Sequence, residues 1–227
     1  MLDWLAQHGQ IITTGVQILT ALVWIVYLHI LITGFRRQKR SNILLTRVAG
    51  NKDRAHLMVG NMGAEPIFVS AVMVEMLVDS DTHTAFITDT DAQDEGDALG
   101  HSSQGPLKSA EHRDLGALGD ITDHALSVAG LDTGTQVEEL VVTVMAEGTY
   151  DAQLVAARQG YWINHETDRR LFHPQWTRTR QIRKRRTRKD LLGQLDDHLR
   201  NEAQDVRRSD RDATGHDAAA APAKAAA

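Results

Sequence analysis

The sequence predicts a mainly β protein with helical additions: an N-terminal transmembrane helix, an antiparallel immunoglobulin-like β-sandwich and a C-terminal basic amphipathic helix. A 25-residue stretch from Ile11 to Phe35 contains no Asp, Glu, Lys or Arg. Short runs rich in Val, Ile, Leu and Thr, separated by Gly, Asn, Asp and Pro, fill residues 42–174. Eight cations then lie between residues 178 and 189, ahead of several leucines. We therefore predict four regions: an anchor with its basic stop (1–40), a sandwich (41–174), a basic helix (175–205) and a disordered tail (206–227).

The apolar stretch is long enough to cross a bilayer. Twenty-five helical residues at about 1.5 Å each span about 37 Å, whereas the hydrocarbon core of a bilayer is about 30 Å thick. A buried helix of a globular core is the alternative, but such helices seldom run so far without a charge.

The flanks of this stretch predict its orientation. Arg36, Arg37, Lys39 and Arg40 follow it directly, and the ten residues before it contain no Lys or Arg. A cleavable signal peptide would carry its cations before the apolar run instead. By the positive-inside rule we expect the N-terminus outside and residues 41–227 in the cytoplasm.

Polar residues recur along one face of the predicted span. Thr13, Gln17, Thr20 and Trp24 are spaced by three and four residues, which places them on one stripe of a helix. Such stripes often contact another membrane helix. We expect this face to contact a protein partner or a second copy of the chain.

The strands are predicted from the apolar runs at 43–49, 55–62, 66–78, 82–90, 106–116, 137–147 and 153–163. The run 66–78 is apolar in both alternations, as in a strand covered on both faces. A short helix is expected at 121–128, with Asp120 as its N-cap. Seven short antiparallel strands favour a sandwich.

Four segments along residues 1 to about 195 bear on a resemblance: ALVWIVYL with the following RRQKR, NMGAEPIFV, GPLKSAEH and TRTRQIRKRR. With them the chain resembles bacterial single-span membrane proteins with a small β-rich cytosolic domain. The resemblance implies this layout in the bacterial inner (plasma) membrane. It implies no activity, so no catalytic residue is carried over.

The search for chemistry finds one cluster of ligand-type residues. Asp89, Asp91, Asp94 and Glu95 form an acidic loop that offers oxygen ligands to a hard cation, but the glycine of a calcium loop is replaced by Asp94 and its final Glu by Gly100. The chain lacks cysteine, a nucleophile elbow and glycine-rich phosphate loops. We expect no cofactor and no enzyme. A membrane-bound metal-dependent hydrolase using the acidic loop is the alternative.

A basic helix is predicted over residues 176–204. Its cations are Arg178, Arg180, Arg183, Lys184, Arg185, Arg186, Arg188 and Lys189, and its leucines are Leu191, Leu192, Leu195 and Leu199. It could dock on a protein, lie on anionic lipid or bind nucleic acid. The net charge of -5 and the lack of interleaved aromatic residues disfavour nucleic acid.

Strand parity decides where this basic run begins. Seven alternating strands would end away from the membrane, whereas an eighth strand near 170–173 would return the chain to it. Both possibilities stay open from the sequence. The expected function is that of a membrane-anchored interaction or accessory protein presenting its sandwich and basic helix to a protein partner, with recruitment of anionic lipid as an alternative.

Overall fold

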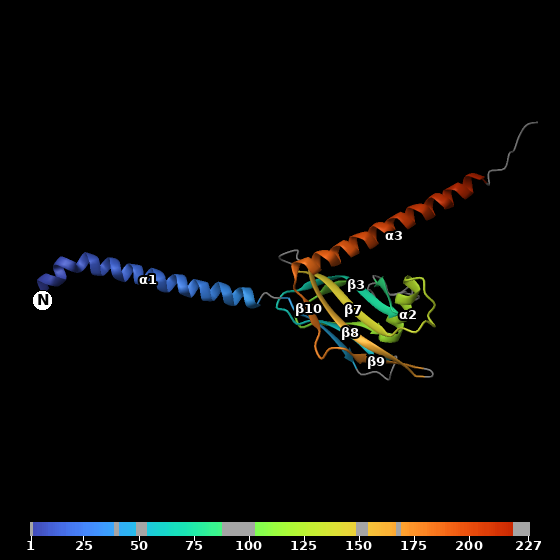
Figure 1. Cartoon of the computed structure of the whole chain (residues 1–227). Coiled ribbons are helices and arrows are strands. Elements are labelled where there is room, and N and C mark those ends of the chain that lie inside the picture. Colours follow the sequence, from blue (N-terminus) through green and yellow to red (C-terminus); the bar gives the residue numbers. More distant parts are fainter. Residues whose placement is uncertain are drawn as a thin grey trace, which may run out of the picture. The chain divides into compact units, whose positions relative to one another are not determined.

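The computed structural model describes residues 2–38, 41–48, 54–87, 103–148, 154–166 and 169–219, with the side chains of the two long helices described at 9–34 and 185–204. The chain forms two compact units, Met1–Ser41 and Asn42–Ala227. The described part of the second unit, which we call the β-domain, contains ten strands and two helices (Figure 1).

The first unit is the helix α1 (Leu2–Gln38). Its segment Gly9–Gly34 is 26 residues long, apolar, and not buried against any other described part of the chain. By length and composition it is suited to span a membrane, as the sequence predicts.

The β-domain is built from two antiparallel sheets that do not close into a barrel, and strands make up 44% of the structure. The smaller sheet has the order β1 (Ile43–Val48), β2 (His56–Asn61), β6 (His112–Ala117). The larger has the order β10 (Arg180–Ile182), β8 (Leu154–Glu166), β7 (Glu139–Gly148), β3 (Ile67–Val78), β4 (Asp81–Ile87), with β5 (Gly105–Leu107) on β3 and β9 (Arg169–Pro174) on β8.

One hydrophobic core joins the inner faces of the two sheets. Leu57 and Val59 of the smaller sheet belong to the same buried cluster as Val74 and Val142 of the larger. Strand β3 is the most enclosed, because Met73 on its outer face is also buried, in a second cluster. The sequence prediction of a strand covered on both faces is confirmed for β3.

The strand registers define two ends of the β-domain. At the end where the chain arrives at Asn42, Ile67 of β3 pairs with Gly148 of β7, and β8 begins. At the opposite end β3 turns into β4 through Asp79 and Ser80, both with positive φ as a type I′ turn requires. We call these the proximal and the distal end.

Two sequence predictions about strands need correction or completion. The single strand expected at 106–116 is two strands in different sheets, β5 and β6, because the chain turns at Ser109 and Ala110, where Ala110 has a φ of 61°. The eighth strand considered near 170–173 is present as β9. It runs antiparallel to β8 and returns the chain toward the proximal end.

The short helix α2 (Leu118–Val128) begins earlier than predicted. Asp120 is not its N-cap but lies in its first turn, and the capping position is Ala117, which has no side-chain oxygen to offer. Asp120 still carries the negative charge that favours a helix N-terminus.

The long C-terminal helix α3 (Arg185–Ala219) begins nine residues later than predicted. Residues 180–182 form β10 instead, because their backbone finds hydrogen-bond partners along residues 156–158 of β8. A local pattern of arginines cannot reveal this pairing with a distant strand. The helix also passes its expected end at residue 204, so the predicted tail at 206–227 is helical as far as Ala219.

Helix α3 packs on the outer face of the larger sheet with its first half. Leu191 is 6% exposed and joins Met73, Met145 and Ala156 in the second hydrophobic cluster. Further along, the His198 ring stacks on Phe86 with 4.6 Å between ring centroids. The Arg188 guanidinium donates to the carbonyl oxygen of Leu154. In Figure 1 the helix starts beside β10 and extends away from the sheet toward its C-terminal end.

Two neighbouring leucines test this packing. Leu191→Ala removes a buried side chain and should destabilise the β-domain by about 2 kcal/mol, since a cavity replaces its contacts. Leu192→Ala is the matched control, because Leu192 is 40% exposed. Thermal unfolding of the full chain in detergent measures both. Equal stability of the two variants would contradict the docking of α3 described here.

Candidate interaction surfaces

The polar stripe of α1 is largely satisfied within the helix itself. The hydroxyls of Thr13 and Thr20 donate to the carbonyl oxygens of Gly9 and Val16, each at 2.8 Å. Trp24 contacts Tyr27 edge to face at 6.1 Å. Within the described part of α1, the carboxamide of Gln17 makes no such bond. Gln17 thus differs from Thr13 and Thr20, whose hydroxyls bond to the helix backbone.

The eight predicted cations do not form one helical surface. Arg178 lies in the turn before β10, Arg180 lies in β10, and Arg183 and Lys184 link β10 to α3. The remaining four, Arg185, Arg186, Arg188 and Lys189, form the first turns of α3. All of them are exposed except Arg188, which is half-buried. We call residues 178–189 the basic segment.

Trp176 fixes the start of this segment. The Arg180 guanidinium carbon lies 3.9 Å from the centroid of the Trp176 ring, and that of Arg158 lies 5.5 Å from it. Such cation–π contacts hold a guanidinium in place while leaving it charged. The sequence shows both arginines, but not that β8 and the turn after β9 bring them to one ring.

Gly160 makes room for this turn on β8. A Cβ at this position would lie 2.4 Å from Gln175 Oε1 and 3.3 Å from the Trp176 ring. The missing side chain lets the backbone N–H of Gln175 donate to the Gly160 carbonyl oxygen at 2.8 Å. In addition, Gln159 Nε2 donates to the Trp176 carbonyl oxygen at 2.9 Å.

Two side chains of the basic segment bond to the outer edge of β1. Thr179 Oγ1 accepts from the backbone N–H of Leu45 and donates to the Leu45 carbonyl oxygen, both at 2.9 Å. The Gln181 carboxamide does the same at Ile43, accepting at 3.2 Å through Oε1 and donating through Nε2. These bonds connect residues that are 134 and 138 positions apart. They hold the basic segment beside the first residues of the β-domain.

A cavity of about 670 Å³ lies between β1 and residues 174–181. Its lining includes Arg47, Tyr161 and Arg178, and contains neither Asp nor Glu. Burial raises the pKa of Tyr161 to about 12, although the Arg47 charge opposes this. The phenol is therefore neutral at physiological pH. The cavity walls thus present positive charge and neutral hydroxyl and amide groups.

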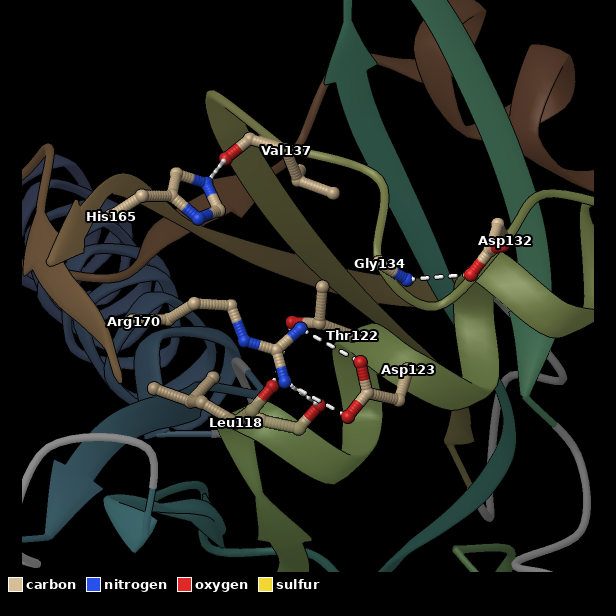
Figure 2. A network of polar contacts seen from close by, with 9 residues as sticks. Leu118, Thr122, Asp123, Asp132, Gly134, Val137, His165 and Arg170 are labelled. Carbon is tan, nitrogen blue, oxygen red and sulfur yellow. Dashed lines mark hydrogen bonds and ion pairs between the residues drawn. The ribbon is translucent and has the colours of Figure 1, made fainter. Parts of the chain in front are cut away.

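The distal end is held by a polar network between α2 and β9 (Figure 2). The Arg170 guanidinium makes a bidentate ion pair with Asp123, with both N–O distances at 2.8 Å. Its Nη2 also lies 3.4 Å from the Gly119 carbonyl oxygen. Nearby, His165 Nε2 is 2.8 Å from the carbonyl oxygen of Val137. The network joins α2 to β9 and joins β8 to the segment before β7.

The predicted acidic loop lies outside the described residues, and this applies to Asp89, Asp91, Asp94 and Glu95. Within the described residues, no three His, Asp or Glu side chains come together as a metal site would require. The described residues therefore supply no group of metal ligands for the alternative of a metal-dependent hydrolase.

The chain matches no protein-family model, no curated protein and no solved structure.

Glu75 is an acidic group whose environment disfavours its charge. It lies on the outer face of β3, where burial raises the pKa of its carboxyl, the Arg158 charge lowers it less, and Glu139 raises it further. A raised carboxyl pKa means that ionisation costs more in the folded than in the unfolded state. This cost is absent at low pH, where both states are protonated, and grows as the pH rises above the ordinary Glu pKa.

Glu75→Gln should therefore stabilise the β-domain at neutral pH and lose that advantage below about pH 4. Denaturant unfolding of the variant and the wild type at both pH values measures the difference. Glu138→Gln serves as the control, because Glu138, just before β7, is exposed. A variant that is less stable than the wild type at pH 7 would show that Arg158 outweighs burial.

Proposed function

We propose that this chain is a single-span, membrane-anchored interaction protein. Its span fixes it in a bacterial inner membrane with the N-terminus outside, and the β-domain works in the cytoplasm. The cations that follow Phe35 support this orientation. In this proposal the chain presents an immunoglobulin-like sandwich and the basic helix to a protein partner.

The immunoglobulin-like assignment draws support from the two antiparallel sheets. They share one hydrophobic core, stay unclosed, and carry edge strands at β1 and β4. Sandwiches of this kind often serve as binding modules, because their loops and edges vary while the core is retained.

The observation that carries the proposal is Gln17. It is a carboxamide within the apolar helix, near three threonines (Thr13, Thr14 and Thr20) that bond to their own backbone. Lipid offers a carboxamide no hydrogen bond, so a second helix is the natural source of one. A partner protein or a second copy of this chain would supply it.

The β-domain also leaves part of α3 available. Leu192 is 40% exposed and Leu199 is 48% exposed, whereas Leu191 is buried against the larger sheet. An exposed helix surface with apolar residues suits a protein partner that offers a complementary groove. In this proposal the span contacts a partner protein within the membrane, and α3 contacts the same partner in the cytoplasm.

Replacing one side chain of the span tests this proposal. Gln17→Leu should weaken association in the bilayer by about 5- to 30-fold, since interhelical hydrogen bonds contribute about 1–2 kcal/mol. Thr20→Val is the control, because the Thr20 hydroxyl already donates to Val16. Chemical crosslinking of the full chain in its native membranes gives the readout.

Loss of the crosslinked species in Gln17→Leu but not in Thr20→Val supports the proposal, whether that species holds a second copy or another protein. A wild-type chain that stays entirely monomeric under these conditions contradicts it.

A further inference from the structure

The basic segment lies at the proximal end of the β-domain. Its Gln181 bonds to Ile43, the first residue of β1, and its Ile182 pairs with Ala156, near the start of β8. The parity left open by the sequence is thereby resolved within the β-domain. Strand β9 runs back toward the proximal end. The cations that follow β10 lie at this end, where the chain enters the β-domain.

Chain connectivity limits how far this end can lie from the end of the apolar helix. Only residues 39–41 separate Gln38 from Asn42, and four Cα–Cα steps reach about 14 Å at most. The first residue of the β-domain is thus close along the chain to the end of the proposed span, and the basic segment is bonded beside that first residue. Charges act on one another over a Debye length of about 8–10 Å at physiological salt.

No described residue forms an ion pair with a cation of the basic segment. Residues 174–189 contain no Asp or Glu. Arg180 rests on Trp176 and Arg188 bonds to a backbone oxygen. Eight positive charges within twelve residues of chain repel one another, so a surface rich in negative charge would relieve that repulsion.

We propose that the basic segment binds the head groups of anionic lipids on the cytoplasmic surface of the membrane, where the chain emerges from the span. The inference rests on the proposed membrane anchorage and adds a second, electrostatic attachment to it. Arg183, Lys184, Arg185 and Arg186 make the main contacts, because they are exposed and lie between β10 and the packed part of α3. Trp176, Thr179 and Gln181 hold the segment in place, so that little ordering is needed on binding.

Lipid fits these observations better than nucleic acid does. The Trp176 ring beside the segment is already covered by Arg180 at 3.9 Å and cannot stack on a base from that side. A soluble acidic protein would bind these cations equally well anywhere on the β-domain. It therefore does not explain why they lie at the proximal end.

The absence of cysteine allows a direct test with single probes. Thr187→Cys places a fluorophore in the basic segment, and Thr133→Cys places one before β7 at the distal end; both residues are exposed. The full chain is reconstituted in vesicles of phosphatidylcholine alone, or with about one-third phosphatidylglycerol, each with a quencher on the head groups. The anchor is present in both, so a difference between them reports charge.

The expected result is quenching at residue 187 that is at least about twofold greater with phosphatidylglycerol and is lost at about 1 M salt, where the Debye length is about 3 Å. Residue 133 should show no difference. The triple variant Lys184→Gln, Arg185→Gln, Arg186→Gln should abolish the effect at residue 187. A matched triple variant, Arg54→Gln, Arg169→Gln, Arg200→Gln, should retain it, because these exposed cations lie outside the basic segment.

Equal quenching at residue 187 in both vesicle types overturns the proposal, as does an effect that the matched variant removes equally well. Binding of a protein to the basic segment in place of lipid would also overturn it. Alkaline carbonate extraction of the same vesicles distinguishes a failure of the lipid contact from a failure of the proposed membrane anchorage. A chain that is extracted is not anchored, whereas a chain that resists extraction but ignores lipid charge disproves only the lipid contact.

Discussion

The organisation of the β-domain depends on how the outer edge of β1 is closed. An edge strand exposes backbone N–H and C=O groups that would otherwise pair with another chain. Here Thr179 and Gln181 each offer one donor and one acceptor, and each satisfies both backbone groups of one residue, Leu45 and Ile43. Two side chains thus replace a neighbouring strand.

This closure connects the edges of the two sheets and has a functional consequence. Because Gln181 follows Arg180 in β10 of the larger sheet, the bonds to β1 also place the cations at the proximal end. In the proposed function Gln17 of the span recognises another helix. In the further proposal the basic segment of the β-domain recognises lipid charge.

Much of this layout follows from local sequence. The long apolar helix α1 is evident from its uncharged stretch, and β3 from apolar residues in both alternations. The division of residues 106–116 into β5 and β6 was not predicted, because it depends on a turn at Ala110, a residue with no preference for positive φ. Residues 180–182 read as part of a helix, since their pairing with β8 is a tertiary contact that overrides local propensity. The cations themselves were evident, but the contacts from Thr179 and Gln181 that place them span more than 130 residues of sequence.

Amide hydrogen exchange at the edge of β1 tests the central claim most directly. In the full chain in detergent, the amides of Ile43 and Leu45 should exchange at least about 100-fold more slowly than in an unstructured peptide, since both are hydrogen-bonded. The double variant Thr179→Val, Gln181→Leu should lose this protection, while Leu44, which pairs with Gly60 on β2, should keep its own. Rapid exchange at Ile43 and Leu45 in the wild type, or protection unchanged in the double variant, would contradict the placement of the basic segment on β1.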